Sequence, residues 1–145
     1  NKQDLKLETK ELSLDGLKCL VAEDNAINAQ ICKHFLESMG IEACMTEDGE
    51  EVCDRFFTTQ DFSFDFILMD VQMPKLNGYD ATRKIRKSAR DDRNIPIIAF
   101  TADAYDDDVK KAILSGMDGH VSKPVSKESL RETITTTILK CSYKK

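Results

Sequence analysis

The amino-acid sequence predicts an α/β fold, a doubly wound five-stranded parallel sheet with five helices. Short apolar runs alternate with segments whose apolar residues recur at helical spacing, and this alternation repeats five times. Such alternation is typical of parallel sheets, since two parallel strands need a crossover connection, which is usually a helix. Right-handed crossovers place helices on both faces and gather the loops that follow the strands at one edge.

The chain begins its regular pattern with an expected strand at Lys18–Glu23. Asn25 can cap the helix that follows, and Gly40 can end it. The apolar residues of this helix are four positions apart: Ile27, Ile31, Phe35 and Met39. Ile41–Thr46 alternates weakly between apolar and polar residues, which favours a strand at the edge of the sheet.

The next helix has a start signal of its own. Asp48-Gly49-Glu50-Glu51 has the spacing of a capping box, and Val52 and Phe56 are expected on the buried face. The run Phe66–Met69 is the most continuously apolar of the chain. A strand that is buried on both faces has this composition, so we expect it at the centre of the sheet.

The second half repeats the alternation. Asn77-Gly78 precedes a helix that contains Ala81 and Ile85, and Ile95–Phe100 is the fourth strand. Asp103 can cap a helix that ends at Ser115-Gly116 and carries Val109, Ala112 and Ile113. Gly119–Ser122 is a short fifth strand. Ser126 opens a last helix with an apolar row of Leu130, Ile134 and Ile138.

Length and charge limit the possible functions. The chain has 145 residues, of which 41% are hydrophobic, and this suits a single core. A net charge of −5 argues against direct binding of nucleic acid or contact with an anionic membrane. No apolar run approaches the length needed to span a bilayer, and no signal-peptide pattern opens the chain.

Cysteine usage points to a reducing compartment. The cysteines at 19, 32, 44, 53 and 141 include no CxxC pair, and their odd number does not suit a disulfide framework. Most lie in apolar stretches, so we expect reduced thiols in the core, no zinc site and a cytoplasmic domain. The parent protein can still be anchored in a membrane.

Three regions differ in composition. Residues 1–16 mix charges with isolated leucines, which predicts a linker or arm from a preceding domain. Residues 17–140 form the expected folded domain, and 141–145 a C-terminal tail. Because the chain does not begin with Met, we expect a segment of a longer protein.

Charged residues follow the expected strands. Glu23 and Asp24 follow the first, Asp70 the third and Lys123 the fifth, while Thr101 follows the fourth. Since these strand ends meet at one edge, the sequence predicts a single site there. Mg²⁺ prefers oxygen ligands, which Glu23, Asp24, Asp70 and the backbone carbonyl of Gln72 can supply; Mn²⁺ is an alternative ion.

The same residues suit phosphoryl transfer. With a bound cation, Asp70 can attack phosphorus and form an aspartyl phosphate. Lys123 offers a positive charge to the phosphoryl oxygens, and the Thr101 hydroxyl can donate a hydrogen bond to one of them. Such transfer depends mostly on positioning and charge neutralisation, which this residue set provides.

The combination of these motifs resembles a known family. Glu23-Asp24-Asn25, Asp70 after Phe66–Met69, Met73-Pro74 with Gly78, Thr101-Ala102 and Lys123-Pro124 are similar to the receiver domain of two-component response regulators. The similarity covers residues 17–140 and is greatest to receivers of hybrid sensor histidine kinases, notably in Met69–Pro74 and Gly116–Gly119. It implies a flavodoxin-like strand order of 2-1-3-4-5.

The resemblance also implies roles. Asp70 would be the phosphoacceptor, Glu23 and Asp24 the acidic pair for Mg²⁺, Thr101 the switch hydroxyl and Lys123 the phosphoryl contact. The phosphoryl donor would be a histidine kinase or a histidine phosphotransfer domain, and a weak homodimer is a further expected partner state. The domain would catalyse its own phosphorylation and slow autodephosphorylation.

Three positions depart from the family pattern or tune it. His120 stands where many receivers carry a switch Tyr or Phe, so a histidine switch and a merely packed imidazole both remain open. By resemblance, Gln72 and Asp103 flank the path of the attacking water, so tuning of the lifetime of the aspartyl phosphate and simple exposure to solvent both remain open.

Three other functions fit the same architecture less well. An aspartate-nucleophile phosphatase or mutase needs a second acid two residues after Asp70, where this chain has Gln72. A flavodoxin-like cofactor binder needs a phosphate loop after the first strand, where the acidic pair would repel phosphate. A pseudo-receiver that only binds partners would not need the intact residue set. The chain lacks a glycine-rich ATP loop and is not expected to be the kinase itself.

Overall fold

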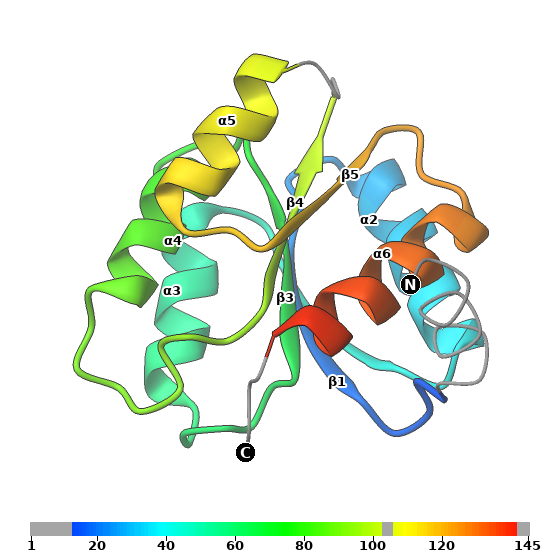
Figure 1. Cartoon of the computed structure of the whole chain (residues 1–145), viewed down its shortest axis with the longest axis horizontal. Coiled ribbons are helices and arrows are strands. Elements are labelled where there is room, and N and C mark those ends of the chain that lie inside the picture. Colours follow the sequence, from blue (N-terminus) through cyan, green and yellow to red (C-terminus); the bar gives the residue numbers. More distant parts are fainter. Residues whose placement is uncertain (1–12, 103–105, 142–145) are drawn as a thin grey trace.

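A parallel sheet of five strands organises the molecule (Figure 1). The computed structural model describes residues 13–102 and 106–141. The strands are β1 (Lys18–Ala22), β2 (Glu42–Thr46), β3 (Phe66–Asp70), β4 (Ile97–Thr101) and β5 (Gly119–Ser122). Their order is β2-β1-β3-β4-β5, and every neighbouring pair is parallel. The predicted fold class and strand order are confirmed.

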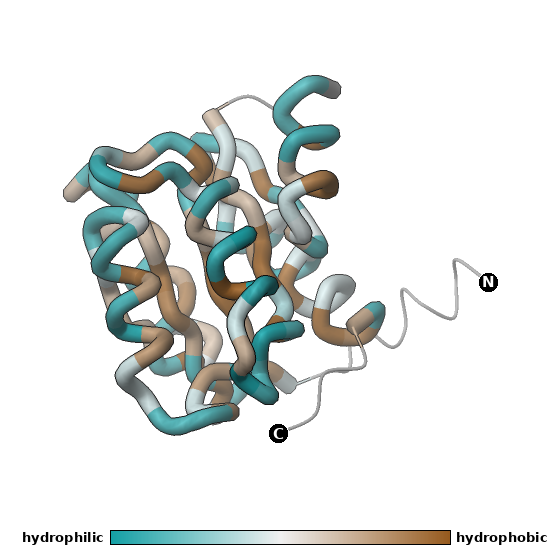
Figure 2. The backbone as a smooth tube through the Cα atoms, turned by 90° about the vertical axis from the view of Figure 1, so that its left-hand side faces the viewer, coloured by the Kyte–Doolittle hydropathy of each residue, from teal (hydrophilic) through white to brown (hydrophobic). Residues whose placement is uncertain are grey.

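Helices cover both faces of this sheet. The helices are α2 (Ala26–Ser38), α3 (Gly49–Thr58), α4 (Gly78–Arg86), α5 (Asp106–Ser115) and α6 (Lys127–Lys140). Seen along the sheet, α3, α4 and α5 lie on one side, and α2 and α6 lie on the other (Figure 1). Each side has its own apolar cluster, and the strands contribute alternate residues to the two. The apolar residues follow the strands through the interior (Figure 2).

Polar side chains begin the helices where the sequence predicts them. The side-chain oxygens of Asn25 and Asp48 accept hydrogen bonds from the backbone N–H groups three residues later, at 3.0 and 2.8 Å. Ser126 Oγ accepts the equivalent bond at 3.1 Å. The predicted cap at Asp103 lies outside the described residues.

The buried face of α2 differs from the expected one. Ile27 and Ile31 are 70% and 39% exposed, whereas Cys32 and Leu36 are fully buried. A step of four residues turns an α-helix by about 400°, so a row with this spacing drifts around the helix and leaves the core. Only Met39, at the end of the predicted row, is buried. Ile113 on α5 is likewise 65% exposed, while its neighbour Ala112 faces the core.

The core extends into the predicted linker. Leu14 is 1% exposed and packs in the cluster beneath α2 and α6. The Gly16 N–H donates a hydrogen bond to the Gly40 carbonyl at 2.9 Å, which fixes the entry of the chain beside the end of α2. Residues 1–12 of the predicted linker and 142–145 of the predicted tail lie outside the described residues. None of the helices in the described ranges combines the length and apolar character needed to cross a bilayer.

Candidate functional site

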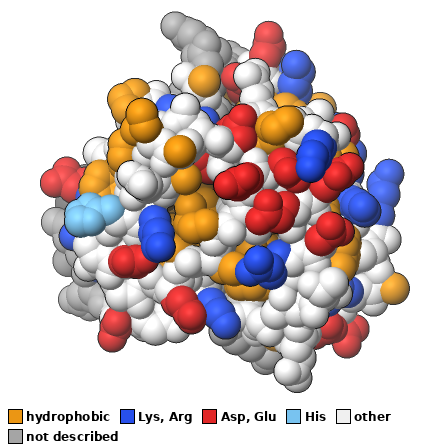
Figure 3. All heavy atoms as spheres, turned by 180° about the vertical axis from the view of Figure 1, so that it is seen from behind, with side chains coloured by type: hydrophobic (Ala, Val, Ile, Leu, Met, Phe, Trp, Pro, Cys, Tyr) orange, Lys and Arg blue, Asp and Glu red, His pale blue; other side chains and the backbone are white. Residues whose placement is uncertain are grey.

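The carboxyl ends of four strands bring the predicted residues to one edge of the sheet. Glu23 and Asp24 follow β1, Asp70 and Thr101 end β3 and β4, and Lys123 follows β5. The backbone N–H of Lys123 donates to the Thr101 carbonyl at 2.7 Å, so the lysine is tied directly to the end of β4. On the face seen in Figure 3, acidic side chains gather in the upper half, the end of the molecule at which the strands finish (Figures 1 and 3).

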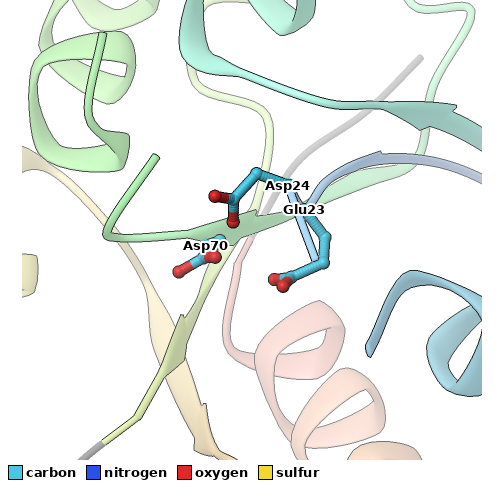
Figure 4. A group of neighbouring side chains, drawn as sticks. All are labelled: Glu23, Asp24 and Asp70. Atoms are coloured by element: carbon cyan, nitrogen blue, oxygen red, sulfur yellow. The ribbon is translucent and has the colours of Figure 1, made fainter. Parts of the chain in front are cut away.

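Three carboxylates lie close together at this edge. One oxygen from each of Glu23, Asp24 and Asp70 falls within 4.8 Å of the others (Figure 4). Glu23 and Asp70 are each 2% exposed, whereas Asp24 faces solvent. Oxygen ligands at this spacing, open on one side, fit a hard cation that keeps several waters, such as Mg²⁺.

Lys123 lies against the buried part of the acidic group. Its Nζ is 3.1 Å from Asp70 Oδ2 and 3.2 Å from Glu23 Oε2. Burial opposes the charge of this ammonium, but the hydrogen bonds and charges of Asp70 and Glu23 prevail and raise the pKa of Lys123. The lysine therefore stays protonated beside the carboxylates.

Asp70 is held in an unfavourable charged state. Burial and the nearby Glu23 carboxylate raise its pKa from 3.8 to about 6, against the opposing effects of Lys123 and of the Gln72 N–H. The N–H of Gln72 donates to Asp70 Oδ1 at 3.0 Å. One lysine thus does not balance two buried carboxylates and their exposed neighbour, so a cation would relieve an existing excess of negative charge.

The Thr101 hydroxyl has no hydrogen-bond partner within the described part of the chain, although it is fully buried. A buried hydroxyl of this kind costs free energy until an acceptor arrives. Its position at the end of β4, one residue beyond the partner of Asp70 in the sheet register, puts it beside the acidic group. It is suited to donate to an anion that binds there.

Close backbone packing, which the sequence alone does not predict, shapes the loop that follows Asp70. A Cβ atom on Gly78 would lie 2.2 Å from the Asp70 carbonyl oxygen, and one on Gly49 would lie 1.8 Å from that of Leu76. The beginning of α3 therefore rests directly on this loop. Lys75, with a φ of 69°, takes a left-handed conformation that is uncommon outside glycine.

The remaining predicted residues have exposed side chains or lie outside the described ranges. The Gln72 side chain is exposed and lines an open groove of about 420 Å³ together with Asp24, Met73 and Tyr79. His120 is exposed on β5 and lines a different surface hollow with Ile113 and Met117. Asp103 lies outside the described residues.

Comparison with known families and proteins gives one consistent answer. The family described as the response regulator receiver domain matches residues 19–135. Hybrid signal transduction histidine kinase I of Dictyostelium discoideum is 41% identical over 129 residues, which cover 87% of this chain and 7% of that protein. The osmosensing histidine protein kinase SLN1 of Saccharomyces cerevisiae is 38% identical over 126 residues, covering 83% of this chain and 10% of the kinase. The chain thus spans a tenth or less of these relatives.

Solved structures share the fold over nearly their whole length. The receiver domain of sensor histidine kinase PA1611 from Pseudomonas aeruginosa PAO1 has a TM-score of 0.75 and 32% identity, over 87% of this chain and 99% of that one. That domain was crystallised with a magnesium ion coordinated in its active-site cleft. The receiver domain of a signal transduction histidine kinase from Syntrophus aciditrophicus also has a TM-score of 0.75, with 27% identity over 90% of this chain and 96% of that one.

Proposed function

This chain belongs to the response regulator receiver domain family, and we propose on that basis that it accepts a phosphoryl group from phosphohistidine on Asp70. It is a receiver domain of the kind found in hybrid histidine kinases. The single observation that supports Asp70 as the acceptor is its surroundings. Asp70 is a buried carboxylate within 4.8 Å of two further carboxylates and 3.1 Å from an ammonium group.

We further propose that Mg²⁺ is the required ion. Glu23, Asp24 and Asp70 would hold it through carboxylate oxygens, with the Gln72 carbonyl as a neutral ligand; Mn²⁺ is the alternative. When bound, the ion supplies the positive charge that lets an anionic phosphoryl group approach this acidic edge. The excess negative charge around Asp70 supports this assignment.

The chain's own residues would then carry the transfer. A carboxylate oxygen of Asp70 attacks phosphorus, the bond between phosphorus and the donor imidazole nitrogen breaks, and that nitrogen keeps the electron pair. Lys123 pairs with the transferred oxygens, because its ammonium is already 3.1 Å from Asp70. Thr101 donates the hydrogen bond for which its buried hydroxyl has no present acceptor in the described ranges.

The signal would persist until water hydrolyses the acyl phosphate. Gln72 and Asp103 are proposed to control that step, since both would flank the path of the water. Movement of Thr101 toward the bound phosphoryl group would displace α5, which shifts the population between two packed states. The isolated domain would therefore catalyse its own phosphorylation and slow dephosphorylation.

The partner would be a histidine kinase or a histidine phosphotransfer domain. The family of the chain and its match to short stretches of much longer hybrid kinases support this. The five cysteines, all free, also fit the proposed cytoplasmic location of the domain.

Incubation with acetyl phosphate and MgCl₂, followed by intact-protein mass measurement, tests the proposal. We expect one phosphoryl adduct that hydroxylamine removes and that neither EDTA-treated protein nor the Asp70→Asn variant forms. Asp80→Asn is the matched control, because it makes the same chemical change at an exposed carboxylate on α4 and should leave the adduct intact. An adduct that persists in Asp70→Asn would refute the assignment.

A further inference from the structure

The geometry points to Phe100 as a positioning residue for Lys123, a role that rests on the proposed phosphoryl transfer. We propose that the face of the Phe100 ring holds the ammonium group in place when the neighbouring carboxylates bind a cation. Phe100 itself would touch neither the metal nor the phosphoryl group. It would act through the lysine.

The sheet register places Phe100 beside Asp70, between β3 and β5. Asp70 on β3 pairs with Phe100 on β4, and Phe100 pairs in turn with Val121 on β5. Paired residues of a parallel sheet point to the same face, so the ring lies between Asp70 and the strand that leads to Lys123. Phe100 is 1% exposed and belongs to the apolar cluster beneath α2 and α6.

The ammonium of Lys123 lies over this ring. Its Nζ is 5.0 Å from the ring centroid, within the range of a cation–π contact. The same nitrogen is 3.1 Å from Asp70 and 3.2 Å from Glu23. Lys123 therefore has two kinds of contact, one with carboxylates and one with an aromatic face.

The two kinds of contact respond differently to a cation. Carboxylates that ligate a metal give up part of their negative charge, so their hold on the lysine weakens. The ring is uncharged and is not a metal ligand, so its attraction for the ammonium remains. An aliphatic residue at position 100 would fill the space but lacks the negative ring face. Phe100 would thus keep Lys123 where the phosphoryl oxygens arrive.

A purely structural role for Phe100 predicts different results, and Phe66 provides the matched control. Phe66 is also fully buried, belongs to the same apolar cluster, and begins the strand that Asp70 ends. Phe100→Leu and Phe66→Leu remove the same atoms from the same cluster. Both should destabilise the fold, but only Phe100→Leu should slow phosphorylation by acetyl phosphate, by about fivefold.

A graded change of ring electronics separates attraction from packing. Site-specific incorporation of mono-, di- and trifluorinated phenylalanine at position 100 withdraws electrons from the ring face with little change in volume. We expect the phosphorylation rate constant to fall with each fluorine at position 100 and to stay constant across the same series at position 66. If the rate constant does not change across the series at position 100, although the wild-type protein is phosphorylated, the proposed role of Phe100 is overturned. The proposed function is then unaffected.

A second measurement needs neither metal nor phosphoryl donor. In EDTA, the Cε methylene protons of Lys123 should show an upfield NMR shift from the Phe100 ring current, identified by the loss of that signal in Lys123→Met. The shift should disappear in Phe100→Leu and persist in Phe66→Leu; persistence in both would refute the contact. If the ring-current shift is present but the wild-type protein forms no adduct, the proposed function is refuted. The contact then exists, but it has no catalytic consequence.

Discussion

The charge on Asp70 should make the metal-free domain less stable than the Asp70→Asn variant, which lacks this charge. The pKa of Asp70 rises from 3.8 to about 6 in the folded state, chiefly through burial. A shift of about two pH units corresponds to roughly 3 kcal/mol of differential free energy between the charged and the neutral carboxyl. Since Asp70 is only 2% exposed, solvent screens little of this cost. At neutral pH, where the group is charged, folding therefore carries most of that penalty.

The sign of the pH dependence follows from the raised pKa. Between about pH 4 and pH 6 the folded protein binds more protons at Asp70 than the unfolded chain does, so this group's contribution to stability falls as the pH rises. Asp70→Asn removes the charge and keeps a side-chain oxygen that can accept from the Gln72 N–H. We expect this variant to be more stable than wild type by about 1–3 kcal/mol near pH 7.5 and equally stable near pH 4.

Urea unfolding in EDTA, at a series of pH values, measures the difference. Titrating groups away from the site contribute equally to both proteins, so the difference between the two unfolding free energies reports Asp70 together with Glu23 and Lys123, which contact it. Adding Mg²⁺ should cancel or reverse this difference, because an ion at about 100 times its dissociation constant stabilises the folded wild type by about 2.7 kcal/mol. An Asp70→Asn variant that is less stable than wild type near pH 7.5 in EDTA, with an unchanged m-value, would refute this reasoning.

Three further predictions concern other parts of the molecule. Gly49→Ala should displace the loop after Asp70 and weaken Mg²⁺ binding measured by calorimetry. Gly119→Ala is the control: its Cβ would meet the Thr137 hydroxyl at 2.5 Å, so it should lower the stability of the fold without weakening Mg²⁺ binding. Thr101→Val should raise the free energy of unfolding by about 1 kcal/mol, because it removes a buried hydroxyl that lacks a partner in the described ranges. The same variant should abolish the phosphorylation-dependent NMR shifts of α5. Burial opposes ionisation of Asp92, but hydrogen bonds from Arg90 and the Phe62 N–H lower its pKa, so Asp92→Asn should cost about 2 kcal/mol at neutral pH in urea unfolding. That cost should shrink as the pH falls through the lowered pKa, and a cost that is constant with pH would contradict the ion-pair explanation.

The strands could be predicted because each carries its own signal. Gly119–Ser122 has the predicted bounds, and the others differ by one or two residues at one or both ends. The buried face of α2 could not be predicted from the spacing of its isoleucines, since burial depends on where the helix lies against the sheet. Leu14 was missed for a similar reason: a single leucine in a charged segment has no periodicity, and its burial arises only when the folded chain places it in the apolar cluster beneath α2 and α6.

The predicted site residues that follow the strands come together because parallel topology dictates it. The supporting positions could not be found in this way. Phe100 reads as one more apolar residue of a central strand, and only the register with Asp70 and the path of the Lys123 side chain relate it to the site. Gly49 reads as part of a capping box, and the reason for its lack of a side chain is the Leu76 carbonyl, which is distant in sequence.

Each face of the sheet has a buried cysteine whose alkylation rate can report how often that face opens. Cys19 and Cys32 lie in the apolar cluster beneath α2 and α6, and Cys53 lies in the one beneath α3, α4 and α5. Burial raises the pKa of Cys32 to about 12 and that of Cys53 to about 11, so both thiols resist alkylation until their surroundings open. The rate at which each thiol is trapped reports the opening of one layer alone. The native chain, without any introduced label, can therefore reveal whether a signal loosens both layers together or only the one that carries α5.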